Sequence, residues 1–337
     1  MRFLATLLLA SALTVATQVP AQGVGPTASL QQARRLANTG HGDDALKLLN
    51  QLPATASGVQ NARGLAFYDL QQFPEADKAF AAALQQDPKD DEAAQMRGLT
   101  LFRLGRPAEA IPLLEATRGV DAQTKASPTY VLALCYVDTR RYDDARRAYA
   151  AQFGFLPDGA SAYLLAARML LRREYLPVAQ RFATEALQRD PRLTLAHELL
   201  GEIALAGNHT EEAIQHFQQE RDSNPLEPLT YERLGDAYSR LGRYPEARQA
   251  LQRAVLLEPN STAPYILLGK VTLKEGDAVA ALTFLQRAER MDSANYMTHN
   301  LLAQTYRTLG LAPDAERERK LTEETQTRAE PRLTTLR

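Results

Sequence analysis

The sequence has almost no cysteine and no tryptophan: Cys135 is the single cysteine among 337 residues. One cysteine can form neither an internal disulfide nor a cysteine-based zinc site. An excess of charge of one sign is also missing, because 39 Lys and Arg residues stand against 40 Asp and Glu residues. Nucleic-acid-binding proteins are usually basic overall or carry a basic stripe, so this balance argues against that class. A hydrophobic content of 45% excludes a mainly disordered chain.

The first 21 residues are typical of a secretory signal peptide. Arg2 precedes an apolar run over residues 3–16, and Val19 and Ala21 are small enough for the −3 and −1 positions of a cleavage site. The run is shorter than the roughly 20 residues that a membrane-spanning helix needs. We therefore expect a cleaved signal over 1–21, a linker over 22–28, and an exported bacterial protein, periplasmic or secreted. The alternative is a short, uncleaved membrane anchor. No later stretch is apolar enough to predict a transmembrane segment in the mature chain.

Alanines recur at a nearly constant spacing along the rest of the chain. The intervals are 31, 34 and 35 residues and then 34 throughout, and they separate Ala45, Ala76, Ala110, Ala145, Ala179, Ala213, Ala247, Ala281 and Ala315. The clearest unit, residues 228–261, contains Tyr231, Leu234, Gly235, Tyr238, Ala247, Leu251, Ala254 and Pro259. This pattern resembles the tetratricopeptide repeat, which has an aromatic residue, Leu-Gly, Tyr, Ala-x-x-x-Phe and Pro over 34 residues. The resemblance covers nearly all of the expected mature chain.

The same unit predicts two helices joined by a turn. Tyr231, Leu234 and Tyr238 share one face of a 3.6-residue helix. Ala247, Leu251 and Ala254 share one face of a second helix, and the small residues Gly235 and Ala247 would let the two backbones approach closely. Glycines fall just past the first helix in several units, where a left-handed residue ends a helix: Gly105, Gly242, Gly276 and Gly310.

Because one such hairpin cannot bury its apolar face alone, the units must stack. We predict an all-α, right-handed superhelical solenoid of about nine helix-turn-helix repeats over residues 29–325. The predicted repeats are 29–53, 57–90, 91–125, 126–159, 160–193, 194–227, 228–261, 262–295 and 296–325. The last unit turns polar, as the exposed end of a repeat array should, and residues 326–337 are predicted to form a C-terminal tail.

Chemistry-bearing motifs are mostly missing from the sequence. It has no phosphate-binding glycine loop, no nucleophile elbow and no HExxH motif. His197 and His299 occupy the aromatic position of their repeats, where packing accounts for them. Glu212 and His216 lie one helical turn apart, but a third metal ligand is not apparent, so we interpret them as a surface pair. We therefore expect no catalytic residue, no bound metal and no cofactor.

The resemblance also implies a binding groove, because one side of the first helix of each tetratricopeptide repeat binds peptides or partner helices. Residues at those positions form an apolar and aromatic stretch, then an acidic stretch, then a basic one. The candidate groove residues are Leu65, Tyr68, Asp69, Leu99, Phe102, Arg103, Tyr130, Leu134, Arg168, Arg172, Glu198, Glu202, Glu232, Asp236, Arg240, Lys270 and Lys274. The alternative for any one of them is packing against a neighbouring unit or simple solvation.

These features predict a non-catalytic protein-interaction scaffold that binds a peptide or partner protein, without nucleic acid. The alternative is an accessory or targeting subunit of an envelope enzyme complex, in glycan or secretion machinery. An enzyme in its own right ranks third, because the sequence offers no acid–base constellation.

Overall fold

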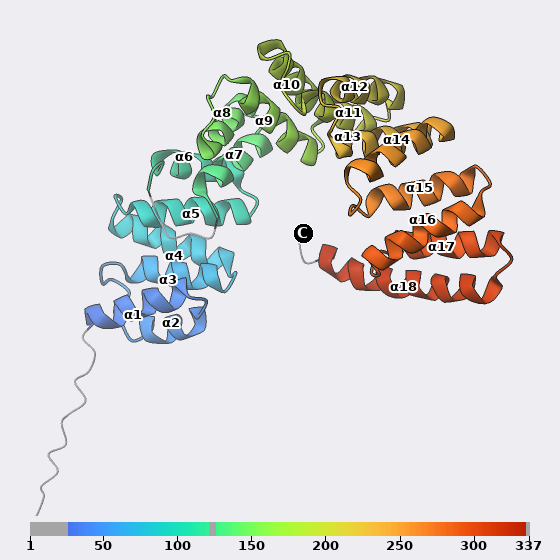
Figure 1. Cartoon of the computed structure of the whole chain (residues 1–337). Helices are drawn as coiled ribbons and strands as arrows, with labels where there is room; N and C mark the ends of the chain where they lie inside the picture. Colours follow the sequence, from blue (N-terminus) through green and yellow to red (C-terminus); the bar gives the residue numbers. More distant parts are fainter. Residues whose placement is uncertain (1–25, 121–125, 335–337) are drawn as a thin grey trace, which may run out of the picture. The chain divides into compact units, whose positions relative to one another are not determined.

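The computed structural model describes residues 26–120 and 126–334, with side chains through residue 327 at the C-terminal end. These residues form 18 α-helices and no strand (Figure 1). The predicted all-α repeat fold is therefore confirmed. The predicted signal peptide at 1–21 and most of the linker at 22–28 lie outside the described residues.

The helices follow one another in antiparallel pairs. The described elements are α1 (Pro26–Asn38), α2 (Gly42–Leu49), α3 (Val59–Asp69), α4 (Phe73–Gln86), α5 (Asp91–Arg103), α6 (Pro107–Ala116), α7 (Pro128–Asp138), α8 (Tyr142–Phe153), α9 (Ala160–Arg172), α10 (Leu176–Arg189), α11 (Ala196–Ala206), α12 (Thr210–Ser223), α13 (Pro228–Arg240), α14 (Tyr244–Leu257), α15 (Ala263–Lys274), α16 (Ala278–Met291), α17 (Tyr296–Thr308) and α18 (Ala312–Thr334). Between residues 57 and 295, each predicted repeat range contains one consecutive pair.

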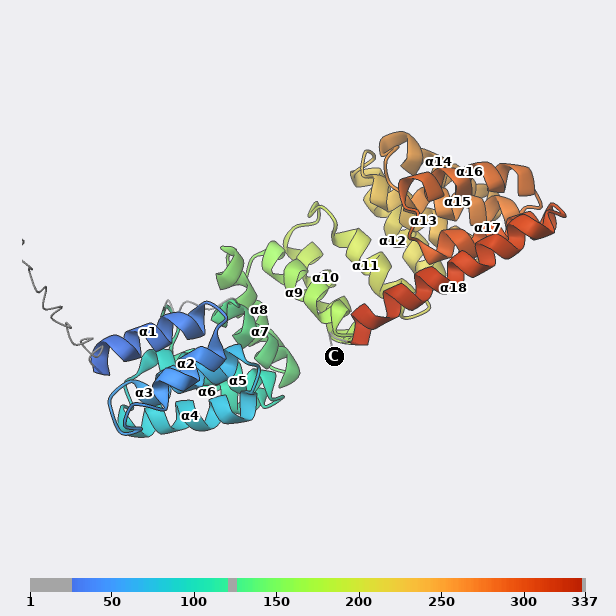
Figure 2. The same cartoon turned by 90° about the horizontal axis from the view of Figure 1, so that it is seen from below.

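The C-terminal end differs from the predicted tail. Helix α18 continues to Thr334, so residues 326–334 are helical, and α18 extends beyond α17 in Figure 2. The helix is polar, but its charges support it locally: Arg319 pairs with Glu316 one turn before it, at 2.7 Å, and with Glu323 one turn after it. Ion pairs at this spacing stabilise a helix whose own apolar face is weak.

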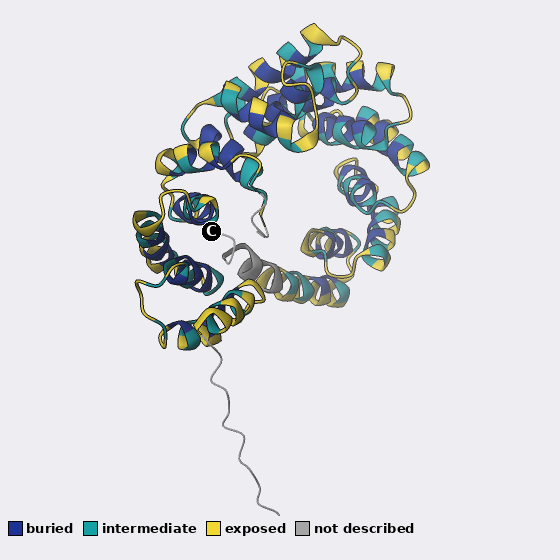
Figure 3. Ribbon diagram, turned by 90° about the vertical axis from the view of Figure 1, so that its left-hand side faces the viewer, coloured by how far each residue is buried: buried dark blue, intermediate teal, exposed yellow. Residues whose placement is uncertain are grey.

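The chain divides into two compact units, and the division falls inside α7. Unit 1 ends at Val131 and unit 2 begins at Leu132. Within unit 1, α3 contacts α1, α2, α4 and α5. Within unit 2, each helix from α8 to α18 contacts the next, and α13, α15 and α17 also contact one another in order. Buried residues, dark blue in Figure 3, lie on the helix faces that meet their neighbours. Among the described residues, no helix is both long and apolar enough to cross a membrane.

The turn between the paired helices carries a left-handed residue in unit after unit. The prediction for the glycines is confirmed: φ is +71° at Gly105 and Gly242, +90° at Gly276 and +77° at Gly310. The equivalent positions of other repeats hold larger residues at φ values of 59–62°, namely Gln71, Arg140, Glu174 and Asn208. The turn geometry is therefore imposed by helix pairing, and glycine meets it at the lowest conformational cost.

A small residue on the first helix faces a large one on the second. A Cβ atom built on Gly235 would lie 2.4 Å from Cγ of Leu251, and one on Gly64 would lie 2.5 Å from the ring of Phe80. Ala247, which the sequence placed opposite Gly235, is fully buried, but the side chain that fills the space above Gly235 is Leu251.

Gly235→Ala should therefore destabilise unit 2. The added methyl group meets a branching carbon rather than a flexible chain end, so we expect a loss of roughly 1–2 kcal/mol in the free energy of unfolding. Urea unfolding followed by circular dichroism measures this loss. Gln249→Ala, at an exposed position of α14, is the control and should change stability by less than about 0.5 kcal/mol. Equal stabilities for both variants would contradict the close approach at Gly235.

Candidate functional site

The first helices of successive repeats enclose a cleft in unit 1. The cleft has a volume of about 460 Å³ and is lined from α1, α3, the start of α4, α5 and α7 up to Val131. Every candidate groove residue of unit 1 lines it: Leu65, Tyr68, Asp69, Leu99, Phe102, Arg103 and Tyr130. The repeat register therefore places these side chains in one cleft, which is the arrangement that a ligand site requires.

Several lining residues were not among the sequence candidates. They come from the end of α1, the turn after α3, the start of α4, a buried position of α5, and the residues around the start of α7: Ala37, Asn38, Gln71, Phe73, Met96, Ala126 and Val131. Phe73 is the most informative, because it is the first residue of α4 and so belongs to the second helix of its repeat. The repeat register predicts groove residues only on the first helix of each repeat, so it does not predict Phe73.

Aromatic rings make the wall of the cleft. The rings of Tyr68 and Phe73 meet edge to face, with centroids 5.5 Å apart and planes at 69°. Phe73 also contacts Arg103, whose guanidinium carbon lies 5.4 Å from the centre of the Phe73 ring. Such cation–π and edge-to-face contacts hold the three side chains in a defined arrangement. A pre-ordered wall reduces the side-chain entropy that is lost when a ligand binds.

The polar side chains of the cleft differ in their capacity to form a further hydrogen bond or ion pair with a ligand. Burial raises the pKa of Tyr68, and the nearby Arg103 only partly offsets this, so the phenol stays neutral and can donate a hydrogen bond. Oδ2 of Asp69 accepts the backbone N–H of Gly42 at 3.0 Å, which ties α3 to the start of α2. Arg103 is exposed and forms no ion pair with any residue that the structure describes. The cleft thus presents a cation and a phenol on an otherwise apolar surface.

The other candidate groove residues belong to unit 2, and several are already paired there. Arg233 binds Glu202 at 3.0 Å, and Arg240 binds Asp236 at 2.8 Å. Leu134, Arg168, Glu232 and Lys270 are half-buried, while Arg172 and Lys274 are exposed. The acidic stretch is therefore partly neutralised within the unit itself, which leaves less charge for a partner than the sequence suggested.

Glu198 does not have the exposed groove position that the sequence suggested, because its side chain is buried in unit 2. Only 2% of Glu198 is exposed, and the Thr230 hydroxyl donates to its Oε2 at 3.5 Å. Burial, helped by the charge of Glu202 and opposed by that of Arg168, raises the pKa of Glu198 to about 7. The repeat register predicts which side of the helix carries Glu198. How far that side is buried depends on the neighbouring helices.

His197, which the sequence indicates as a packing residue, also contacts a second histidine. His197 lies on α11 beside His216 of α12, with their Nδ1 atoms 3.3 Å apart and their rings stacked. Burial and the neighbouring imidazole lower the pKa of His197. The surface pair expected for Glu212 and His216 is long, at 4.0 Å, so the contact between the imidazoles is the closer one.

Three family models match segments of the chain. The model for "Anaphase-promoting complex, cyclosome, subunit 3" matches residues 69–152, and two tetratricopeptide-repeat models match residues 176–228 and 228–261. Residues 228–261 are also the clearest unit of the sequence repeat.

Known proteins with the same repeat are similar over part of their length. A "TPR repeat-containing protein" of Treponema pallidum is 25% identical in a 265-residue alignment that covers 69% of this chain and 32% of that protein. "Superkiller protein 3" of Schizosaccharomyces pombe is 28% identical over 120 residues, 36% of this chain and 9% of that protein. The matches thus span a third or less of these relatives. The solved structure of YrrB, titled "a TPR protein with an unusual peptide-binding site", is 21% identical, with a TM-score of 0.45 over 54% of this chain and 94% of that one. This chain belongs to the tetratricopeptide-repeat family.

Proposed function

We propose that the chain is a non-catalytic scaffold that holds an extended peptide, or a segment of a partner protein, in the cleft of unit 1. The observation that carries this proposal is the convergence of four aromatic side chains and one unpaired cation in that cleft: Tyr68, Phe73, Phe102, Tyr130 and Arg103. Proteins of the tetratricopeptide-repeat family bind protein or peptide partners, which supports a peptide as the occupant of this cleft.

The lining also indicates what kind of segment fits. A large apolar side chain would bury itself against the aromatic wall, since apolar anchors supply most of the binding energy at such sites. The guanidinium of Arg103 can hold a carboxylate with two parallel hydrogen bonds. We therefore propose a segment in which a Leu, Ile or aromatic residue stands close to an acidic side chain or to a C-terminal carboxylate.

A peptide array tests this specificity. Peptides with an apolar residue near a carboxylate should bind the purified protein, and versions with the carboxylate replaced by an amide should bind about ten-fold more weakly. With Arg103→Gln, the two versions should bind equally. If the wild-type protein does not distinguish the two versions, or if Arg103→Gln keeps the distinction, Arg103 does not orient the ligand.

We also propose that this scaffold works in a bacterial envelope, either alone or as an accessory subunit of an envelope enzyme complex. The support is the apolar run at residues 3–16 followed by Val19 and Ala21. The expected result is that the mature protein begins at Gln22 and is released from cells by osmotic shock. N-terminal sequencing and fractionation measure both properties. An intact Met1 terminus, or retention in the membrane fraction, would contradict export.

A further inference from the structure

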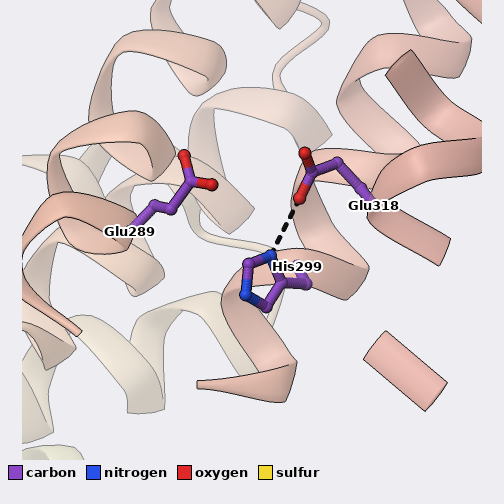
Figure 4. A group of neighbouring side chains, drawn as sticks. All are labelled: Glu289, His299 and Glu318. Atoms are coloured by element: carbon purple, nitrogen blue, oxygen red, sulfur yellow. Dashed lines mark hydrogen bonds and ion pairs between the residues drawn. The ribbon is translucent and has the colours of Figure 1, made fainter. Parts of the chain in front are cut away.

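Three chemistry-bearing side chains converge at the C-terminal end of unit 2, far along the chain from the cleft. Glu289 of α16, His299 of α17 and Glu318 of α18 each offer one ligand atom, and these atoms lie within 4.8 Å of one another. His299 and Glu318 are each 2% exposed, and Glu289 is half-buried. Figure 4 shows the two carboxylates approaching the imidazole from different helices.

Hydrogen bonds orient the imidazole for coordination. Nε2 of His299 donates to the backbone carbonyl of Ser293 at 3.0 Å, so Nδ1 is the nitrogen that faces the carboxylates. Nδ1 lies 2.8 Å from Oε2 of Glu318. Histidines that bind metals usually donate their other ring N–H to a carbonyl or carboxylate in this way. The Arg317 guanidinium holds Oε1 of Glu318 at 3.1 Å and so leaves Oε2 to face the imidazole.

Glu289 adds a second carboxylate to this cluster. The contact between His299 and Glu318 is complete without it, and no hydrogen bond or ion pair joins Glu289 to any residue that the structure describes. The charge of Glu289 acts on the His299 imidazole through space, without a direct bond between the two side chains. Both of its carboxylate oxygens therefore remain available to a cation that also contacts His299 and Glu318.

We propose that Glu289, His299 and Glu318 form a binding site for a divalent transition-metal cation, best matched by Zn²⁺. The ligands would be Nδ1 of His299 and one oxygen from each carboxylate, which is a mixed nitrogen–oxygen set that suits zinc. The proton between Nδ1 and Glu318 leaves to solvent when the cation enters. The distance from Nδ1 to Oε2 must then open to the roughly 3.4 Å that tetrahedral bonds of about 2.1 Å require. The cation would join the last three helices of the repeat array.

The experiment compares metal binding in four untagged, full-length proteins. They are the wild type, Glu289→Gln, and two controls: Glu324→Gln at an exposed position of α18, and His216→Ala, which removes one imidazole of the His197–His216 contact. Each protein is stripped with EDTA, and its Tm is measured with and without ZnCl₂. Calorimetry gives the stoichiometry, and the visible absorption of added Co²⁺ reports tetrahedral coordination independently of stability.

The wild type and both controls should show a Zn²⁺-dependent rise in Tm of at least about 3 °C and one tight site per chain. Glu289→Gln should keep the metal-free Tm of the wild type, because the bond between His299 and Glu318 remains, but it should lose the rise and the Co²⁺ absorption. The proposal is overturned if wild-type Tm does not respond to Zn²⁺, if Glu289→Gln responds fully, or if the response is lost only in His216→Ala.

Discussion

Phe102→Ala should weaken peptide binding by about thirty-fold, which corresponds to about 2 kcal/mol, and leave the helix content unchanged. Phe102 lies on α5, is half-buried, and lines the cleft of unit 1 beside the aromatic wall. A ring with one accessible face is a favoured anchor for an apolar side chain of a partner. Its removal should therefore reduce the contact area with the peptide more than the packing within the folded chain.

The measurement pairs two assays on the same variant. Fluorescence anisotropy with a peptide selected from the array gives the binding loss, and thermal unfolding gives the change in stability. Phe182→Ala is the matched control, because Phe182 is 2% exposed in the core of unit 2, and its loss should cost about 3–5 kcal/mol of stability. If Phe102→Ala is destabilised as strongly as the control, Phe102 is a core residue. If it is stable and binds normally, the peptide binds elsewhere.

Glu198→Gln should make unit 2 more stable at pH 8, by roughly 3 kcal/mol, and almost unchanged at pH 4.5. Burial raises the pKa of Glu198 to about 7 in the folded state, against an ordinary value near 4.5. The folded state therefore binds the proton more tightly than the unfolded state does. The stability that comes from this group is complete below pH 4.5 and is lost as the pH rises through 7. Glutamine keeps the shape and stays neutral, so it removes this loss.

Urea unfolding at several pH values between 4.5 and 8 tests the Glu198 prediction. Glu211→Gln is the control, because Glu211 is an exposed acid on the adjacent helix α12 and should leave the pH dependence unchanged. Burial also raises the pKa of Glu232, so a smaller slope of the same sign should remain in Glu198→Gln. If Glu198→Gln loses as much stability as the wild type between pH 4.5 and 8, Glu198 is not the group that titrates.

Much of the site was predictable because its residues follow a local rule. Leu65, Leu99 and Phe102 stand at fixed positions of the first helix in successive repeats, and helices of the same register present the same side to the same neighbours. The cleft therefore contains every candidate that precedes Val131. Phe73 could not be found this way, because its place in the cleft depends on the angle at which α4 leaves the turn.

The sequence by itself determined the repeat, the helix pairs and the left-handed turns, because each depends on the periodicity and backbone preferences of a few neighbouring residues. Only the tertiary structure decided which side chains meet across helices. It put Leu251 over Gly235, buried Glu198 instead of exposing it, and brought Glu318 of a polar terminal helix onto His299. The physical reason is that repeat register specifies the direction of a side chain, whereas burial, charge pairing and pKa depend on what the adjoining helices place in front of it.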